Sequence, residues 1–493
     1  MLRIIRIILA LFFFLGITFL LIDVSGLLHH SLGWMAHLQL LPAVLSFNIL
    51  IVAILMVLTL LFGRIYCSIV CPMGVLQDIF NRLGRPLFKK RRHFSKDRKG
   101  LRYTVMSLFI VLLAAGLNQI AMLIAPYSAY GRVAATLLQP LYAGANNLLA
   151  LWSSHGGHSL FYEVPVVWRG GVAAMVAVVT LVVIGALSSR YGRLWCNTVC
   201  PVGTLLGIVS RFSLFRVVLD AGRCKHCNRC AGNCKSMCID IGHHQIDHSR
   251  CVVCMDCLDQ CKFGALRYKF TGLKPDAGRP VSRSSGDDAP SRRRFLATSV
   301  LLAAGAATAA SAKVVDGGLA LIEEKRPPLR KTPVKPFGSL SQRHFSSHCT
   351  SCMLCVSQCP QHLLQPSRRF ESLLQPEMQF GQGFCPPACT RCSQLCPTGA
   401  IRPVTPEQKT SISVGYAVLV PDNCISNTRG VNCTACYRHC PAGAIHMVRN
   451  QGGRLIPSVD ENRCLGCGAC EYYCPSRPFS AIYVEGRDTH TLI

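Results

Sequence analysis

The sequence lacks the motifs that mark the common nucleotide-dependent and haem-containing redox proteins. It has no Walker loop, no nucleotide-binding glycine fingerprint and no C-x-x-C-H haem attachment site. Acidic residues are also scarce, with 24 Asp and Glu against 52 Lys and Arg. These absences leave the 29 cysteines as the candidate groups for redox chemistry.

The formal net charge of +28 does not indicate a nucleic-acid partner. The run Lys89-Lys90-Arg91-Arg92 borders a predicted membrane helix, where basic residues retain a loop on the cytoplasmic side. Each cysteine-ligated iron–sulfur cluster would also add roughly two negative charges, which the formal count omits. We therefore expect membrane lipid and redox partners, and no nucleic acid.

The chain has room for a membrane domain and several soluble modules, because it has 493 residues of which 50% are hydrophobic. Four apolar runs are predicted to cross the membrane, at residues 4–22, 43–62, 104–125 and 171–188. Arg3 and Arg6 place the N-terminus in the cytoplasm, and the loop over 23–42 has no Lys or Arg, as expected of an external loop. The sequence thus predicts an all-α polytopic membrane domain over residues 1–210.

A further apolar run, 133–152, is predicted to lie outside the membrane. Gln139-Pro140 and Asn146-Asn147 would place a helix breaker and uncompensated amides in lipid. If this run crossed the membrane, the two copies of the cysteine motif described next would lie on opposite faces. We therefore expect an external, interfacial segment here.

The membrane domain contains an internal duplication. Residues 63–74 and 192–203 both read Gly-Arg, two residues, Cys-x-x-x-Cys-Pro-x-Gly, and each copy follows a predicted helix. Four thiols would stand at the cytoplasmic surface and could ligate a further cluster: Cys67, Cys71, Cys196 and Cys200. Free thiols or a reversible disulfide are the alternatives, since a permanent disulfide is disfavoured on a reducing side.

A cysteine-rich module is predicted over residues 211–270. Two C-x-x-C-x-x-C-x-x-x-C motifs wrap a cubane each and exchange their fourth cysteine. This exchange groups Cys224, Cys227, Cys230 and Cys261 in one [4Fe-4S] site, and Cys251, Cys254, Cys257 and Cys234 in the other. Lys235 and Lys262 replace the usual proline, which leaves Cys238 as an alternative to Cys234. Zinc is the alternative metal.

Four more motifs fill residues 346–493, and they predict four further [4Fe-4S] clusters in α+β ferredoxin-like modules. Their cysteines are Cys349, Cys352, Cys355 and Cys359; Cys385, Cys389, Cys392 and Cys396; Cys424, Cys433, Cys436 and Cys440; and Cys464, Cys467, Cys470 and Cys474. Adjacent and nested exchanges of the fourth cysteine are both possible. Six clusters without an evident substrate pocket indicate electron transfer.

Between the two cysteine-rich regions lie two linkers, 271–290 and 313–345, that flank residues 291–312. Ser291-Arg292-Arg293-Arg294-Phe295-Leu296, followed by an Ala-rich run, looks like a twin-arginine export signal in the middle of the chain. Similar numbers of basic residues flank it, so their distribution does not set its orientation. We expect a fifth transmembrane helix or a signal cleaved after Ala310-Ser311-Ala312, with residues 313–493 periplasmic.

These motifs together resemble the NapH/NapG-type ferredoxin proteins of periplasmic nitrate reductase systems, joined here in one chain. Residues 1–270 look like NapH and residues 291–483 like NapG. The resemblance implies a bacterial inner-membrane quinol dehydrogenase component that passes electrons to a periplasmic cytochrome c or reductase. A maturation factor is a second interpretation, since methylamine dehydrogenase accessory proteins share the motifs, and a wholly cytoplasmic-facing relay is a third.

Histidines in the two predicted external loops are candidate proton acceptors from quinol, because imidazole titrates near neutrality. They are His29, His30, His37, His155 and His158.

Overall fold

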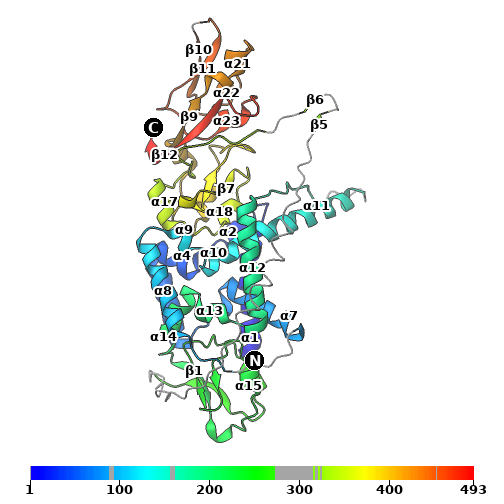
Figure 1. Cartoon of the computed structure of the whole chain (residues 1–493), viewed down its shortest axis with the longest axis vertical. Coiled ribbons are helices and arrows are strands. Elements are labelled where there is room, and N and C mark those ends of the chain that lie inside the picture. The colour runs from blue at the N-terminus through cyan, green and yellow to red at the C-terminus, as the bar shows by residue number, and fades with distance from the viewer. Residues whose placement is uncertain are drawn as a thin grey trace, which may run out of the picture.

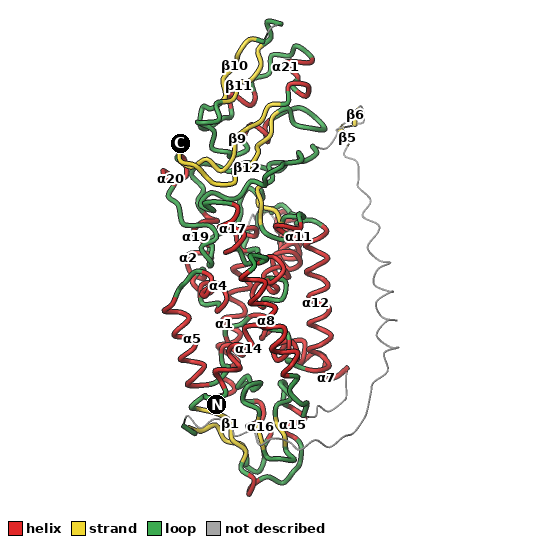
Figure 2. The backbone as a smooth tube through the Cα atoms, turned by 60° about the vertical axis from the view of Figure 1, so that its left-hand side comes forward, coloured by secondary structure: helices red, strands yellow, loops and turns green. Residues whose placement is uncertain are grey.

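The computed structural model describes residues 2–87, 94–155, 161–272, 315–316, 320–321, 325–450 and 452–493. Three parts follow one another along the long axis of the molecule (Figures 1 and 2). The small cysteine-rich module and the N-terminus lie at one end, a helix bundle lies in the middle, and the four-motif region with the C-terminus lies at the other end. We call the last part, residues 325–493, the polyferredoxin region.

Four helices run lengthwise through the bundle: α1 (Leu2–Ile22), α5 (Ile49–Phe62), α8 (Lys99–Ala114) and α12 (Gly171–Tyr191). Within the described residues, α1 and α12 are the two helices whose length and composition would allow them to cross a membrane. The other two are shorter, with 14 and 16 residues. All four present apolar side chains to the outside, among them Phe12, Ile54, Ile110 and Val179.

The second and third apolar runs are divided, so the prediction of one continuous helix in each was wrong. In the second run, α4 (Leu40–Leu45) ends before α5 begins, because the Asn48 side chain accepts a hydrogen bond from the Ile51 N–H and caps α5. In the third run, α8 ends before Gly116, which has a φ of +76°. The short helix α9 (Asn118–Ala121) follows as a separate element.

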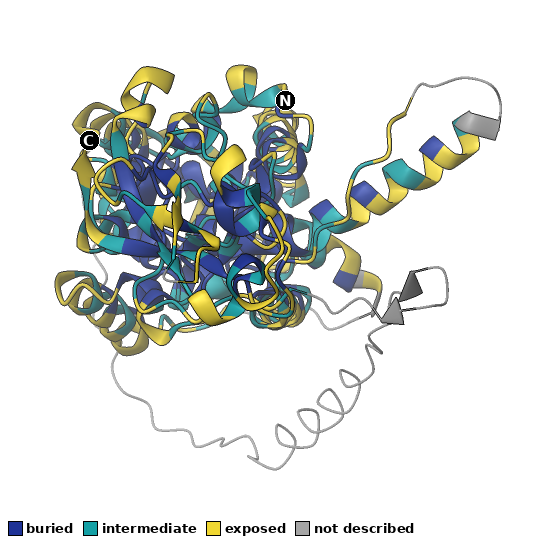
Figure 3. Ribbon diagram, turned by 90° about the horizontal axis from the view of Figure 1, so that it is seen from above, coloured by how far each residue is buried: buried dark blue, intermediate teal, exposed yellow. Residues whose placement is uncertain are grey.

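The run over 133–152 is helical but does not join the lengthwise bundle. It continues α10 (Pro126–Val133) through a π-helical turn (Ala134–Leu138) into α11 (Gln139–His155). This last helix projects sideways from the body of the molecule (Figure 3). Its exposed side chains include Leu141 and Trp152, which are 69% and 79% exposed.

The internal duplication forms two similar helical units. In each, a lengthwise helix ends at a glycine with positive φ, Gly63 (+77°) or Gly192 (+67°), where a side chain would be strained. A short helix follows, α6 (Tyr66–Ile69) or α13 (Leu194–Thr198). The proline of the cysteine motif then begins α7 (Pro72–Leu87) or α14 (Pro201–Ser210), as its missing N–H allows at a first helical position.

The cysteine-rich module is a small α+β unit below the bundle. Strand β1 (Phe215–Leu219) pairs antiparallel with β4 (Leu266–Phe270), and β2 (Ile239–Asp240) pairs with β3 (Gln245–Ile246). Between the strands lie α15 (Arg229–Asn233) and α16 (Asp256–Gln260).

The polyferredoxin region is also α+β, built from short antiparallel ladders. These are β7 (Leu364–Pro366) with β8 (Pro376–Met378), β9 (Ile412–Leu419) with β12 (Ile482–Leu492), and β10 (Ile445–Arg449) with β11 (Leu455–Val459). The helices are α17 (Gln342–His348), α18 (Leu354–Ser357), α19 (Arg391–Leu395), α20 (Pro406–Thr410), α21 (Ile425–Thr428), α22 (Ala435–Arg438) and α23 (Ala469–Tyr473). A separate two-residue pairing joins β5 (Val315–Asp316) to β6 (Ala320–Leu321).

The apolar core of the bundle reaches into both cysteine-rich regions. It contains Val252 of the module and Leu354 and Leu395 of the polyferredoxin region together with the bundle helices. Both regions are therefore fixed to the ends of the bundle by buried contacts. The predicted export signal at 291–312 and the basic run at 89–92 lie outside the described residues.

Candidate cluster sites

We call the two predicted sets of the module site A (Cys224, Cys227, Cys230 and Cys261) and site B (Cys251, Cys254, Cys257 and Cys234). Cys230 lies close enough to Cys227 and Cys261 for their charges to interact. In the same way, Cys257 lies near Cys254, Cys251 and Cys234. This grouping is the one that exchange of the fourth cysteine requires, while ligation itself stays a prediction.

The loops between the first three cysteines share one backbone conformation. In sites A and B the residues immediately before and after the second cysteine have positive φ values: His226 and Asn228, then Val253 and Met255. The same pair of positions recurs at Ser351 and Met353, and at Gly466 and Gly468. Left-handed residues turn successive N–H groups toward one side, which suits an anionic centre. A β-branched residue such as Val253 adopts this conformation only where the surroundings impose it.

Cys238 lies beside site B. Its Sγ is 3.6 Å from the Sγ of Cys234, and its side chain is buried. The structure thus brings both candidate fourth ligands to the same site. The sequence had left these two cysteines as alternatives for that position.

Lys235, which replaces the usual proline, joins the module to the bundle. Its Nζ lies 3.1 Å from the Asp78 carboxylate of α7 and 2.9 Å from the Asp256 carboxylate of α16. Asp78 also binds Arg6 of α1 at 3.2 Å and Arg193 at 2.8 Å. These cations hold the pKa of Asp78 well below its usual range, against the opposing effect of its burial.

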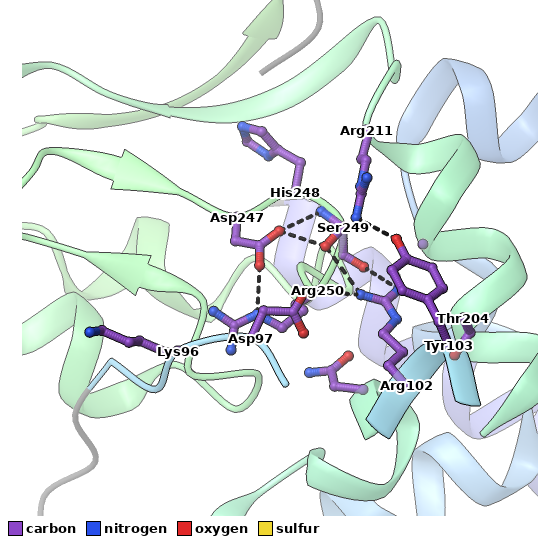
Figure 4. Close-up of polar contacts among 12 residues, drawn as sticks. Lys96, Asp97, Arg102, Tyr103, Thr204, Arg211, Asp247, His248, Ser249 and Arg250 are labelled. Carbon is purple, nitrogen blue, oxygen red and sulfur yellow. Dashed lines mark hydrogen bonds and ion pairs between the residues drawn. The ribbon is translucent and has the colours of Figure 1, made fainter. Parts of the chain in front are cut away.

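A second set of polar contacts precedes site B (Figure 4). Arg102, at the start of α8, donates to the hydroxyl and the carbonyl of Ser249, both at 3.2 Å. Asp247 accepts from the Ser249 hydroxyl at 2.6 Å and from Arg250 at 2.6 Å. The loop that leads into Cys251 is therefore held against the bundle.

The four cysteines of the duplicated motif come together inside the bundle, at the end that carries the module. We call them site M: Cys67, Cys71, Cys196 and Cys200. Each is 4% exposed, and Cys200 lies close enough to the other three for their charges to interact. Two come from each repeat, so the two-cysteine motif of one repeat is completed by the other.

Two buried arginines cross between the repeats at site M. Arg64 of the first repeat donates to the Cys196 carbonyl at 3.1 Å, and Arg193 of the second donates to the Cys67 carbonyl at 2.6 Å. Arg64 is 0% exposed. Among the described residues it contacts amide, carbonyl and thiol groups but no carboxylate. A buried guanidinium requires negative charge nearby, and a cubane held by four thiolates carries roughly two negative charges.

Two glycines allow site M to close. A Cβ at Gly74 would lie 2.2 Å from the Cys67 carbonyl oxygen, and one at Gly203 would lie 2.1 Å from the equivalent oxygen of Cys196. The carbonyl oxygens are backbone atoms, so they cannot move aside easily. The glycine after each Cys-Pro pair is thus required by packing between the short helix and the helix that follows.

We expect Gly203→Ala to lower the stability of the protein by about 1–3 kcal/mol, the usual cost of overpacking. Gly144→Ala is the matched control, because a Cβ at this exposed position of α11 meets nothing within 4 Å. There alanine should stabilise the helix by about 0.5–1 kcal/mol. Thermal unfolding of the two purified variants measures both effects, and equal stability of the two variants would contradict the packing argument.

The polyferredoxin cysteines gather into four sets by exchange between neighbouring motifs. We call them site C (Cys349, Cys352, Cys355, Cys396), site D (Cys385, Cys389, Cys392, Cys359), site E (Cys464, Cys467, Cys470, Cys440) and site F (Cys424, Cys433, Cys436, Cys474). The grouping follows from which thiols lie close enough to interact. The sequence left adjacent and nested exchanges open, and the structure favours the adjacent one.

Sites C to F form a series that starts at the bundle. Site C lies against α10, where a Cβ at Gly131 would meet the Cys352 carbonyl oxygen at 2.1 Å. Site D is next, since Cys355 lies near Cys392, and the Cys385 N–H donates to the Cys467 carbonyl of site E at 2.9 Å. Cys470 of site E lies near a thiol of site F. Site F is therefore the last in the series and the farthest from the bundle.

Polar contacts fix the polyferredoxin region on the bundle. Gln358 donates to the carbonyls of Leu20 (2.7 Å) and Asp23 (2.9 Å) at the end of α1. Arg169, just before α12, donates to the Val356 carbonyl at 2.8 Å. These bonds hold site C over the end of the bundle opposite site M.

The donor sets fit [4Fe-4S] clusters. Backbone N–H groups donate to the Sγ atom of the fourth cysteine of a motif. The Ala265 N–H donates to Cys261 and the Ala444 N–H donates to Cys440, both at 3.3 Å. Lys409 donates to the Cys385 Sγ at 3.1 Å. Across the described ranges, no three His, Cys, Asp or Glu side chains are gathered tightly enough for a single metal ion. A cubane binds four thiolates at separate iron corners, which a set of four cysteines can supply.

The candidate histidines are divided between the described and undescribed parts of the chain. His29 and His30, on α2 (Leu28–Leu32), have ring centroids 4.1 Å apart, and His37 ends α3 (Trp34–His37). Burial lowers the pKa of His37. Gly26 and Gly33 in this loop adjoin Arg391 and Leu395, so these three histidines lie at the polyferredoxin end. His158 and the side chain of His155 lie outside the described residues.

Several contributors were missed from the sequence. Arg64, Arg193 and Lys235 occur within the cysteine motifs, but the sequence did not predict their contacts. No sequence pattern indicated that Lys409 would contact a cysteine. The repeated Gly-Arg before each short helix was the one feature that could have indicated the arginines.

Three family models match the chain, all described by the clusters they bind. A 4Fe-4S binding domain matches residues 46–91 and 171–219, which contain the cysteines of site M. A 4Fe-4S dicluster domain matches 348–428 and 429–477, and a second model of that description matches 247–363. The protein therefore carries several 4Fe-4S binding domains.

The chain is similar to proteins named for electron transport and to proteins named as ferredoxin-type. The putative electron transport protein YccM of Escherichia coli is 27% identical over 50% of this chain and 62% of its own length. The methylamine utilization ferredoxin-type protein MauM of Methylobacillus flagellatus is 31% identical over 32% of this chain and 70% of its own. The ferredoxin-type protein NapG of Escherichia coli is 31% identical over 37% and 80%.

No solved structure matches the chain. The cysteine motifs, the family models and these identities agree with one another. The chain belongs to the NapH/NapG-type family of ferredoxin proteins.

Proposed function

We propose that the protein is an inner-membrane electron conduit that oxidises quinol and delivers electrons to a periplasmic acceptor. The observation that carries this proposal is the placement of the cysteine sets at both ends of one helix bundle. Sites A, B and M lie at the end with the N-terminus, and sites C to F lead away from the other end. Six [4Fe-4S] clusters, with a seventh at site M, would supply one-electron redox centres at these positions.

The bundle has the dimensions of a membrane domain. α1 and α12 have 21 residues each. At 1.5 Å per residue each is about 30 Å long, the thickness of the hydrocarbon core. Arg3 and Arg6 begin α1, and Arg3 binds Asp256 of the module at 3.0 Å, so the positive-inside rule supports a cytoplasmic position for the module. The polyferredoxin region would then be periplasmic.

The positions of the chain before and after the central linker support a module and a polyferredoxin region on opposite faces of the membrane. Phe270 ends the last strand of the module, while Arg326 pairs with Phe479 in the polyferredoxin region. The chain therefore passes from one end of the bundle to the other between these residues. The twin-arginine-like stretch lies in this interval. This arrangement disfavours a relay with every cluster on the cytoplasmic side.

Quinol oxidation releases two electrons and two protons and leaves quinone. Each electron would reduce one iron–sulfur centre. His29, His30 and His37 lie at the polyferredoxin end, where they would accept protons for release to the periplasm. The resemblance to the NapH/NapG-type proteins of periplasmic nitrate reductase systems favours a cytochrome c or a nitrate reductase system as the acceptor.

The test uses the full chain, reconstituted with iron and sulfide and mixed anaerobically with a menaquinol analogue. We expect the visible absorbance of the clusters to bleach and reduced-cluster signals to appear in electron paramagnetic resonance spectra. The dithionite-reduced protein is the reference for full reduction. Protein that dithionite reduces and quinol does not would disprove quinol oxidation.

A second candidate is a maturation factor, favoured by the relatives named for methylamine utilization. The same preparation distinguishes it. A maturation factor should act on a separate redox enzyme, whereas a conduit should turn over quinol repeatedly when a soluble cytochrome c is the acceptor.

A further inference from the structure

A cationic cavity lies where the polyferredoxin region meets the bundle. Its volume is about 240 Å³, and its lining comes from the start of α12, the chain after residue 325, the loop after site C and α23. The charged side chains in the lining are Arg169, Lys325, Arg326, Arg330, Arg368 and Glu471. Five cations thus share the cavity with one carboxylate.

The carboxylate is fully engaged by one of the cations. Both oxygens of Glu471 accept from Arg330, at 2.6 and 2.7 Å, and one also accepts from the Val484 N–H at 2.9 Å. Arg169 donates to the carbonyls of Ala135 and Val356 and to the side-chain oxygen of Gln139. Among the described residues, the hydrogen bonds of Arg169 therefore go to carbonyl and amide oxygens, while the thiols of Cys355 and Cys359 lie nearby.

The other three cations, Lys325, Arg326 and Arg368, also contact groups other than carboxylates. Lys325 donates to the carbonyls of Glu471, Tyr472 and Cys474. Arg326 is exposed and lies over the Phe479 ring, with its guanidinium carbon 6.0 Å from the ring centroid. Arg368 is exposed and reaches Gly170. Within the described residues, the ion pair between Arg330 and Glu471 is the one ion pair that a cavity cation makes.

The beginning of α12 adds a partial positive charge. Gly170 is its N-cap, has a φ of +87° and makes no side-chain cap. The first N–H groups of this 21-residue helix therefore have no side-chain cap, and they follow directly on Gly170, which lines the cavity. This adds to the side-chain cations and favours an anion.

Exposed aromatic side chains lie in the chain segments that lead to the cavity. Trp168 lines it and is 64% exposed, while Tyr162 and Trp152 nearby in the chain are 78% and 79% exposed. Exposed Trp and Tyr mark the headgroup level of a membrane. Arg169 also lies near the thiols of Cys355 and Cys359, so an anion here would be close to sites C and D.

We propose that this cavity binds a phosphate group, with an anionic lipid headgroup as its source. The lipid source depends on the membrane crossing proposed above, whereas the phosphate site does not. A bound phosphate would bridge Arg368 and Arg326 to the start of α12 and so tie the polyferredoxin region to the bundle. The cavity would thereby keep site C in place over the membrane domain.

The test compares the full chain with an Arg326→Gln/Arg368→Gln variant. Both arginines are exposed and neither is a predicted cluster ligand. The matched control is Arg449→Gln/Arg463→Gln, which removes the same charge from exposed positions near the far end. Each protein is purified in non-ionic detergent, checked for iron content, and mixed with phosphatidylglycerol, phosphatidylcholine or inorganic phosphate.

Native mass spectrometry and thermal unfolding measure binding. We expect wild type and control to retain one phosphatidylglycerol and to be stabilised by it, and the cavity variant to bind at least tenfold more weakly. If inorganic phosphate but not phosphatidylglycerol stabilises the wild type, and the cavity variant loses this effect, the phosphate site is supported and free phosphate is its occupant. Equal binding by the cavity variant and the control would overturn the proposal. Quinol reduction of the same samples is scored separately, so loss of the site and loss of the proposed function are distinguishable.

Discussion

Cys200→Ser is expected to remove about four iron atoms per chain, because a cubane at site M would lose one of four ligands. The change should also destabilise the protein. Arg64 is fully buried beside the thiols of site M, and its contacts in the described residues include no carboxylate. Removing the negative centre should cost about 3–5 kcal/mol, as breaking a buried ion pair does.

Iron and sulfide analysis of the reconstituted protein, followed by thermal unfolding, measures both effects. Thr198→Ala is the matched control, since it lies on α13 in the same repeat and loses only a hydrogen bond to the Leu194 carbonyl. The control should keep its iron. An unchanged iron content in Cys200→Ser would show that site M holds no cluster, and the buried cysteines would then be structural thiols.

Asp78→Asn is expected to lower the stability of the protein by about 3–5 kcal/mol, because it leaves buried cations uncompensated. Arg6, Arg193 and Lys235 all bind this one carboxylate. The substitution should also loosen the module, because Lys235 connects Asp78 to Asp256. Increased proteolysis of the module near residue 235 would report that loosening.

The pH dependence of Asp78 has a definite sign. Its pKa is held below the ordinary carboxyl value of about 4, so the stability it contributes is fully present above that value and is lost as the pH falls toward the lowered pKa. Wild type should therefore lose stability in acid more steeply than Asp78→Asn does. Asp220→Asn is the control, since its pair with Arg223 is half exposed on both sides and should contribute about 0–1 kcal/mol. Equal costs for the two variants would contradict the network.

Much of the architecture followed from local patterns. The spacing of the cysteines sets which loops wrap a cluster, and the apolar runs locate the lengthwise helices. The breaks inside two of those runs were not predicted, because Asn48 and Gly116 act through capping and backbone conformation, which hydropathy does not register. The helix over 139–155 was likewise not predicted. It forms despite Pro140, as a continuation of α10.

The sequence by itself determined the family, the number of cysteine motifs and the internal duplication of residues 1–210, because each depends on residues close together in the chain. Only the tertiary structure favoured one pairing of the cysteines in the polyferredoxin region, because exchange of the fourth cysteine joins residues dozens of positions apart and the spacing allows adjacent and nested exchanges alike. It also decided that Arg64 and Arg193 cross between the repeats and that Lys235 replaces a proline to reach Asp78. Such contacts depend on packing between distant segments, which leaves no periodicity or spacing in the sequence.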